Sequence, residues 1–128
     1  MTLNRRIFLG AAAIFLSVPA LAIERLEFDE TAFKAAQDAG RPVLLHVTLA
    51  SCGTCRAQKP IIETIAAQPE FKNLAVFNLD WRSRKDIAKS FGARSQATLI
   101  MFQGRIEVGR SAGDTNPSTI DMMMRQAL

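Results

Sequence analysis

One stretch decides how this chain folds: VLLHVTLASCGTC, residues 43–55. Its first half, residues 43–49, is a near-continuous apolar run, which is typical of a strand covered on both faces. The cysteines of Cys52-Gly53-Thr54-Cys55 come next, and a helical pattern follows them. A strand that leads directly into a helix places Cys52 at the helix N-terminus, where unpaired backbone N–H groups and the helix dipole stabilise a thiolate.

Cys52 and Cys55 are the only cysteines in the chain. At this spacing Cys55 can resolve a mixed disulfide on Cys52 by intramolecular attack, so the pair is a candidate redox site. A closed zinc site needs four ligands, and two cysteines with one histidine do not supply them. Buried structural thiols are the other alternative, but they need no particular spacing.

The first 22 residues have the pattern of an export signal. Arg5 and Arg6 form the charged region, residues 7–18 the apolar region, and residues 20–22 a small-residue cleavage site. The apolar run is shorter than the ~20 residues that a membrane-spanning helix needs. We therefore predict an export signal at 1–22 and one domain at 23–128.

Two export routes fit this segment. The run Asn4-Arg5-Arg6-Ile7-Phe8-Leu9 resembles a twin-arginine signal, although Asn4 stands where Ser or Thr is usual. A general secretory signal that carries two arginines is the alternative. Both routes lead out of a bacterial cytoplasm, so we expect a soluble periplasmic protein in an oxidising compartment.

The charge pattern argues against nucleic acid as a partner. Without Arg5 and Arg6, 14 basic side chains remain against 12 acidic ones. The densest basic cluster, residues 82–89, is preceded by Asp80 and interrupted by Asp86, as expected for a solvated helix face.

Helices and strands alternate on both sides of the opening stretch. Capping residues, glycines and apolar periodicity mark their ends. The predicted order is a helix from Asp29 to Gly40, a strand at 43–49, a helix after Cys52, a strand at 74–80, a helix at 84–91, a hairpin of 98–103 and 105–111, and a helix from Asn116.

This order, with its motifs, resembles the thioredoxin family over essentially the whole of residues 23–128. The matching positions are the Cys52/Cys55 pair, Arg56, Pro60 as the helix-kinking proline, the strand around Asn78, and Gly92, Phe102, Gly104 and Gly113. The resemblance implies an α/β fold, a three-layer α/β/α sandwich whose central mixed sheet has helices on both faces. It also implies an exposed nucleophile at Cys52 and a more buried resolving thiol at Cys55.

Two departures from the family lie beside the cysteines. Ser51 stands where thioredoxins usually carry Trp, and Thr54 replaces the Pro of thioredoxin. Thr54 brings a hydroxyl and a backbone N–H that Pro lacks, and both can donate to a Cys52 thiolate. Our hypothesis is a Cys52 pKa below the ~8.5 of a free thiol and a potential less reducing than thioredoxin's ~-270 mV.

A third departure lies in the loop that faces the cysteines in the family. There the family has a cis-proline, and this chain reads Gln96-Ala97-Thr98. A cis bond before Ala97 would cost roughly 3 kcal/mol without proline, so we expect a trans peptide and a reshaped substrate loop. Loss of the proline ring also leaves open metal or iron-sulfur binding at the cysteines.

His46, the only histidine, lies six residues before Cys52. In the family this position holds a buried Asp that manages the proton of the resolving cysteine. His46 can take that role, because its ordinary pKa of ~6.5 suits proton transfer. The alternative is a core histidine whose nitrogens are satisfied by hydrogen bonds.

We predict an exported thiol-disulfide oxidoreductase, a protein-disulfide reductase that acts as a monomer without a cofactor. Its catalytic residues are Cys52, Cys55 and His46, and its substrate loop is Gln96, Ala97 and Thr98. The resemblance implies two kinds of partner, client proteins with disulfides and a membrane thiol transporter of the Dsb or cytochrome-c-biogenesis type as electron donor. A metal or iron-sulfur carrier and a non-catalytic interaction module are the alternatives.

Overall fold

A computed structural model gives the structure and describes Ile14 and residues 23–128. The predicted export signal lies outside the described residues apart from Ile14. The described elements, in chain order, are β1 (Glu24–Glu27), α1 (Glu30–Asp38), β2 (Pro42–Thr48), α2 (Gly53–Ala66), the 3₁₀ helix η1 (Pro69–Phe71), β3 (Ala75–Asp80), α3 (Lys85–Ser90), β4 (Thr98–Gln103), β5 (Ile106–Ala112) and α4 (Pro117–Arg125).

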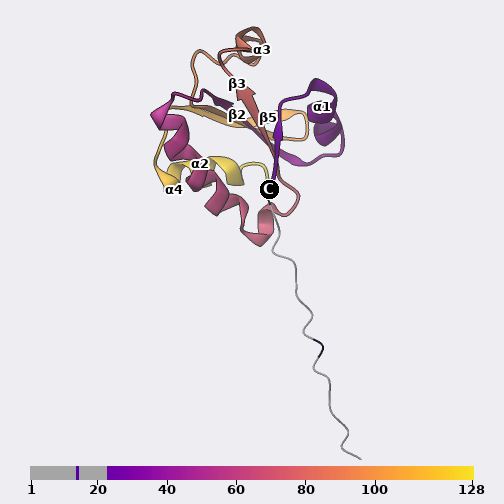
Figure 1. Cartoon of the computed structure of the whole chain (residues 1–128). Helices are drawn as coiled ribbons and strands as arrows, with labels where there is room; N and C mark the ends of the chain where they lie inside the picture. Colours follow the sequence, from indigo (N-terminus) through magenta and orange to yellow (C-terminus); the bar gives the residue numbers. More distant parts are fainter. Residues whose placement is uncertain (1–13, 15–22) are drawn as a thin grey trace, which may run out of the picture.

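The strands form one mixed sheet in the order β1-β3-β2-β4-β5. β1, β3 and β2 run parallel, whereas β4 pairs antiparallel with both β2 and β5. α2 and α4 cover one face of the sheet, and α1 and α3 lie on the other side (Figure 1). This architecture confirms the predicted three-layer α/β/α sandwich.

β2 lies at the centre of the sheet and sends side chains into two cores. Val43, Leu45 and Val47 pack with α1 and α3, while Leu44 packs with α2 and α4. Strand alternation places His46 on the same face as Leu44. The apolar run therefore forms a strand covered on both faces, as its composition predicts.

Five phenylalanines fill the core beneath α1. The ring centroid of Phe33 lies 5.3 Å from those of Phe28, Phe77 and Phe91, and 5.6 Å from that of Phe102. Phe33 is 3% exposed and holds α1 against the sheet. The contacts of Phe33 with Phe77, Phe91 and Phe102 are edge-to-face, and such contacts add to the stabilisation from burying the rings.

The second core contains the apolar face of α4. Ile120, Met124 and Ala127 are buried, and Met123 packs against them. Met122 is 60% exposed on the outer side of the helix.

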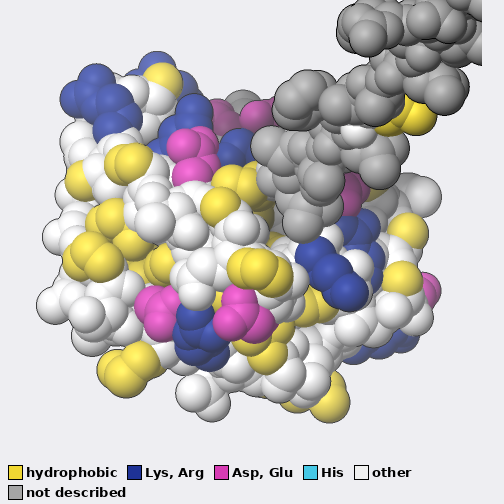
Figure 2. Space-filling model, turned by 90° about the horizontal axis from the view of Figure 1, so that it is seen from below, with side chains coloured by type: hydrophobic (Ala, Val, Ile, Leu, Met, Phe, Trp, Pro, Cys, Tyr) yellow, Lys and Arg dark blue, Asp and Glu magenta, His cyan; other side chains and the backbone are white. Residues whose placement is uncertain are grey.

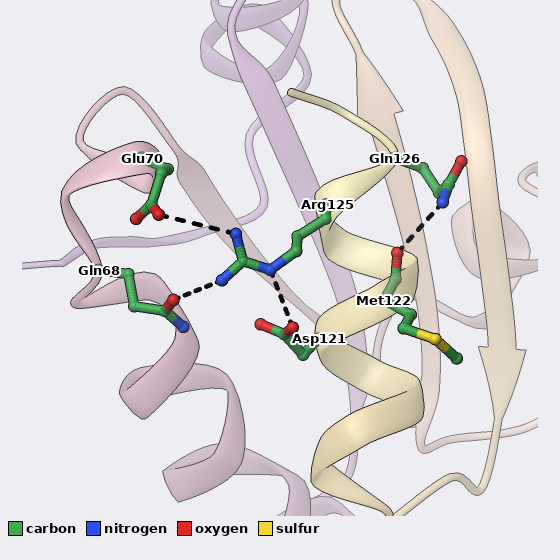
Figure 3. A network of polar contacts seen from close by, with 6 residues as sticks. All are labelled: Gln68, Glu70, Asp121, Met122, Arg125 and Gln126. Carbon is green, nitrogen blue, oxygen red and sulfur yellow. Dashed lines mark hydrogen bonds and ion pairs between the residues drawn. The ribbon is translucent and has the colours of Figure 1, made fainter.

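Arg125 fastens α4 to the segment that follows α2 (Figure 3). Its Nε donates to Asp121 over 2.9 Å, and its other nitrogens reach Gln68 and Glu70. The guanidinium also lies 5.6 Å from the ring centroid of Phe71. One side chain thus links α4 with η1 by both polar and cation–π contacts.

β1 and η1 are absent from the sequence prediction. β1 reads Glu24-Arg25-Leu26-Glu27, with three charged residues and no apolar alternation. It forms because it pairs with β3 and because Arg25 donates to Asn78 Oδ1 over 2.8 Å. Tertiary pairing, rather than local preference, makes this edge strand. The other strands and α3 agree with their predicted bounds within one residue.

Figure 2 shows the face of the molecule that lies below in Figure 1, the side of α2 and α4. Acidic and basic side chains are interspersed there with small apolar patches. None of the helices in the described part of the chain is long and apolar enough to cross a membrane.

Replacing Phe33 with Ala should lower the free energy of unfolding by about 3–5 kcal/mol, because it leaves a cavity at the centre of the aromatic core. Urea unfolding of the oxidised protein measures this change. Ile106→Ala is the control, since Ile106 is 69% exposed, and its effect should stay within about 0.5 kcal/mol. Equal effects of the two substitutions would contradict the assignment of Phe33 to the core.

Candidate active site

The junction between β2 and α2 positions the cysteine pair. β2 ends at Thr48, and the Cys52 N–H then donates to the Leu49 carbonyl over 3.0 Å. Cys52 has extended backbone angles (φ −88°, ψ 109°) and is the N-cap residue of α2. It therefore lies at the positive end of the helix dipole, as the sequence predicts.

Cys52 and Cys55 form a disulfide, with their Cα atoms 5.3 Å apart. The Cys55 N–H donates to Cys52 Sγ over 3.0 Å. The same N–H is placed to stabilise a Cys52 thiolate after reduction. Within the described residues Cys55 is the only donor to this sulfur, so the contribution expected from Thr54 is absent in the disulfide form.

Both sulfur-bearing residues are buried. Cys52 is 9% exposed and Cys55 is 4% exposed. Ala97 and Leu49 pack against the pair. Cys52 is the more accessible residue, but the implied exposed nucleophile is wrong for the disulfide form, because these apolar neighbours cover it.

Ala97 takes the place of the family's cis-proline with a different backbone. Its peptide bond is trans, as predicted, and no cis peptide occurs in residues 23–128. Its φ is +63°, in the left-handed region that side chains rarely adopt. The Ala97 N–H donates to Val47 over 2.7 Å, and its carbonyl accepts from Gly113 over 2.9 Å. Backbone hydrogen bonds on both sides therefore hold the loop against the end of β2.

The two neighbours of Ala97 differ in what they offer. Thr98 begins β4, is 4% exposed, and its hydroxyl donates to the Ser95 carbonyl over 2.8 Å. Gln96 is half-buried, and its backbone N–H and carbonyl make no hydrogen bond with the described part of the chain. Gln96 therefore presents unpaired backbone groups beside the cysteines, whereas Thr98 does not.

His46 is buried on the α2 side of the sheet, with 1% of its surface exposed. Its Nε2 lies 2.9 Å from Oε1 of Gln58, and its Nδ1 has no hydrogen-bond partner among the described residues. Burial lowers the pKa of His46 from 6.5 to about 4, the hydrogen bond with Gln58 opposes this change, and the positive charge of Arg25 adds to it. His46 is therefore neutral near pH 7.

Gln58 is the site residue that sequence reasoning missed. It lies on α2, is fully buried, and contacts His46 as well as the carbonyls of Ala97 and Asp114. Its signal is present in the sequence, because Cys55, Gln58, Ile62 and Ile65 form one buried stripe of the helix. An amide within an apolar stripe needs hydrogen-bond partners inside the protein.

A pocket of about 320 Å³ lies beside the disulfide, and both His46 and Cys55 line it. Arg25, Arg56 and Lys59 line it together with Asn78 and Asp80. One Arg25 nitrogen, Nη2, is buried there without a hydrogen bond. The pocket opens a route between the buried histidine, the resolving cysteine and solvent.

The cysteine pair lacks further metal ligands nearby. Within residues 23–128, no group of three or more His, Cys, Asp or Glu side chains is arranged to hold a metal ion. Among these residues, Cys52 and Cys55 are therefore not joined by a third ligand of these types.

The disulfide lies at a helix N-terminus, one of its sulfurs accepts a backbone N–H, and the loop beside it has unpaired backbone groups. This is the site of a thiol-disulfide oxidoreductase. The family model described as thioredoxin matches residues 23–126. The chain belongs to the thioredoxin family.

Individual relatives agree with this assignment. Thioredoxin 1 of Nostoc sp. is 29% identical over 100 residues, which covers 78% of this chain and 92% of that protein. A thioredoxin of Synechocystis sp. is 30% identical over 91 residues, covering 71% and 84%. The crystal structure of Trxlp from Edwardsiella tarda is similar with a TM-score of 0.76 and 32% identity, and the match covers 79% of this chain and 98% of that one. The protein is thus a thioredoxin-family oxidoreductase with a close cysteine pair.

The lowered pKa of His46 makes stability depend on pH. Between about pH 4 and 6.5 the unfolded chain binds a proton at His46 that the folded chain does not bind, so stability rises with pH in this window. Lowering the pH from 7 to 5 should cost the wild type about 2 kcal/mol through this group. Urea unfolding of His46→Gln, which cannot titrate there, should lack this loss, and parallel profiles for both proteins would contradict the assignment.

Proline should not fit at position 97 in this loop. Ala97→Pro removes the N–H that donates to Val47 and cannot adopt a φ of +63°. We expect the free energy of unfolding to fall by at least roughly 2 kcal/mol. Ala97→Gly is the matched control, because glycine keeps the N–H and adopts positive φ, and its effect should stay within about 1 kcal/mol. A proline variant as stable as the glycine variant would show that the loop can re-form around a ring.

Proposed function

We propose that this protein is an exported disulfide reductase of the thioredoxin family. The observation that carries the proposal is Cys52 as the N-cap of α2, with its sulfur accepting the Cys55 N–H at 3.0 Å. This arrangement stabilises negative charge on Cys52 once the disulfide is reduced, and thiolate is the attacking form. Thiolate stabilisation also favours the dithiol over the disulfide, so we expect a less reducing potential than that of thioredoxin.

In the proposed reaction the Cys52 thiolate attacks one sulfur of a client disulfide. The client S–S bond breaks, its first thiolate leaves, and a mixed disulfide joins Cys52 to the client. Cys55 then loses its proton and attacks Cys52 Sγ, which releases the second client thiolate. The client gains two electrons, and the Cys52–Cys55 pair loses them and becomes the disulfide.

His46 is the proposed acceptor of the Cys55 proton. It is neutral near pH 7 because burial lowers its pKa to about 4, and it lines the same pocket as Cys55. The neutral ring offers a lone pair to the proton as the thiol attacks. Because a pKa of about 4 makes the ring a weaker base than a free imidazole, it passes the proton on through the pocket to solvent and does not retain it. A buried neutral base serves here in the place of the family's buried Asp.

The loop of Gln96, Ala97 and Thr98 is the proposed client-binding segment. Gln96 supports this role best, because its N–H and carbonyl are unpaired within the described chain. An extended client segment can pair with them as an added strand does. The Ala97 N–H and carbonyl already form hydrogen bonds with Val47 and Gly113. The client backbone would therefore pair with Gln96.

Export and re-reduction complete the proposal. The signal pattern at 1–22 supports delivery to the periplasm, by the twin-arginine or the general secretory route. That compartment oxidises dithiols, so a reductase there needs an electron source. A membrane thiol transporter of the Dsb or cytochrome-c-biogenesis type is the proposed donor, and proteins with disulfides are the proposed clients of the monomer.

The function is tested by insulin reduction and by the equilibrium potential against glutathione. Wild type should reduce insulin, and Cys52→Ser should lose the activity. The potential of the pair should lie above ~-270 mV and well below the ~-120 mV of a strong oxidase. Cys55→Ser is the matched variant, because it should still attack and should accumulate the mixed disulfide with its client.

Other outcomes identify the alternatives. A potential near ~-120 mV would contradict the reductase assignment and indicate an oxidase. Colour or stoichiometric metal in protein purified without oxygen would favour the carrier. Loss of stability in Cys52→Ser, with no thiol activity in wild type, would favour an interaction module. Processing at residue 23, read by mass spectrometry of periplasmic protein, tests the export signal.

A further inference from the structure

We propose that Gln58 is a positioning residue that determines which nitrogen of His46 accepts the Cys55 proton and holds the substrate loop to the same helix. The inference rests on the proposed function, because it concerns the resolving step of that reaction. The side-chain hydrogen bonds of Gln58 go to His46 and to the carbonyls of Ala97 and Asp114, and not to the reacting sulfurs. It acts through His46 and through Ala97.

The hydrogen bonds of Gln58 leave one orientation for its amide. Its Nε2 lies 3.0 Å from the Ala97 carbonyl and 2.9 Å from the Asp114 carbonyl. Both carbonyls only accept, so the group that faces them must be the NH₂, which has two hydrogens to donate. The amide oxygen is therefore the atom that faces His46.

This orientation selects the tautomer of His46. The amide oxygen only accepts, so the His46 nitrogen 2.9 Å away must donate, and Nε2 carries the hydrogen. In the neutral ring Nδ1 then has the free lone pair. Nδ1 is also the nitrogen without a partner in the described residues. The proton acceptor is thus Nδ1, and it is left unblocked.

The other half of the amide holds the loop. Ala97 is fixed through its N–H to Val47 at the end of β2 and through its carbonyl to Gln58 and Gly113. The Asp114 carbonyl, which follows β5, accepts from the same NH₂. One buried side chain therefore connects α2, which carries the cysteines, with the loop and with the segment after β5.

In the resolving step the Cys55 S–H bond breaks, its proton forms a bond with His46 Nδ1, and the sulfur electron pair forms the bond to Cys52 Sγ. The client thiolate leaves with the electrons of the mixed disulfide. The imidazolium then carries hydrogen on both nitrogens, and its Nε2–H donates more strongly to the Gln58 oxygen. Release of the Nδ1 proton to solvent, or to the departing client thiolate, restores the neutral ring.

Nitrogen NMR of the wild type gives the first test, because the chain has one histidine and its signals need no assignment. At pH 7 the oxidised protein should show a protonated Nε2 and an unprotonated Nδ1. A proton on Nδ1 in the wild type would overturn the inference by itself. This measurement depends on no variant and on no catalytic activity.

Gln58→Met gives the second test, since methionine has a similar length and no strong donor or acceptor. The preference for the Nε2–H tautomer should weaken. Release of client from a preformed Cys52 mixed disulfide should slow by roughly tenfold or more. This is part of the ~10²–10⁴-fold rate enhancement that a positioned base contributes. The bimolecular attack of reduced Cys52 on a client disulfide should change much less.

Ile62→Val is the matched control, because Ile62 is fully buried on the same face of α2 but is apolar, so it makes no side-chain hydrogen bond to His46 or to the loop. It should lower stability while leaving both the tautomer and the release rate unchanged. A release rate in Gln58→Met equal to that of Ile62→Val, or attack and release slowed equally, would overturn the inference.

The two proposals fail in different ways. If wild type has the Nε2–H tautomer but no thiol activity, the proposed function fails and the geometry of Gln58 stands. If wild type reduces insulin while Gln58→Met keeps both the tautomer and the release rate, the function stands and the positioning role fails.

Discussion

The structure depends on the complete burial of β2 between two layers of helices. Val43, Leu44, Leu45 and Val47 have no exposed surface, and β2 pairs along its length with β3 and β4. A strand held on four sides cannot shift along its axis without exposing apolar side chains on both faces. Its end is therefore fixed, and with it the turn that makes Cys52 the N-cap residue of α2.

The same burial sets the conditions for His46. A charged group at this position would lose its hydration, so the imidazole stays neutral and its pKa falls to about 4. A neutral ring needs one acceptor for its N–H, and Gln58 supplies it from the facing helix. The hydrogen bond between the imidazole and the amide satisfies the His46 N–H without burying a charge. The lone pair of His46 Nδ1 takes no part in this bond and remains free. The arrangement is thus stable in the resting state and still able to accept a proton.

The parts that the sequence predicts are those with strong local patterns. The apolar run of β2, the helix start at Asn116 and the cysteine spacing each specify one arrangement, and the structure agrees with all three. β1 has no such pattern, because its pairing with β3 is what makes it a strand. The contacts of Gln58 were equally hidden, since Ala97 and Asp114 lie 39 and 56 residues away in the chain. Hydrogen bonds of that range depend on the assembled sheet rather than on neighbouring residues.

Ala97 shows how a loop can keep its place when its usual proline is absent. The left-handed backbone of Ala97 lowers the stability of the folded state by about 1 kcal/mol. The hydrogen bond from its N–H to Val47 stabilises the folded state by a similar amount. Proline has no such N–H and could not make this bond, whereas the loop of this chain is held by backbone hydrogen bonds and by Gln58. The small methyl group covers the disulfide with less surface than a ring would. If the loop binds clients as proposed, their selection depends less on contacts with residue 97 and more on the unpaired backbone of Gln96 and the side chains around it.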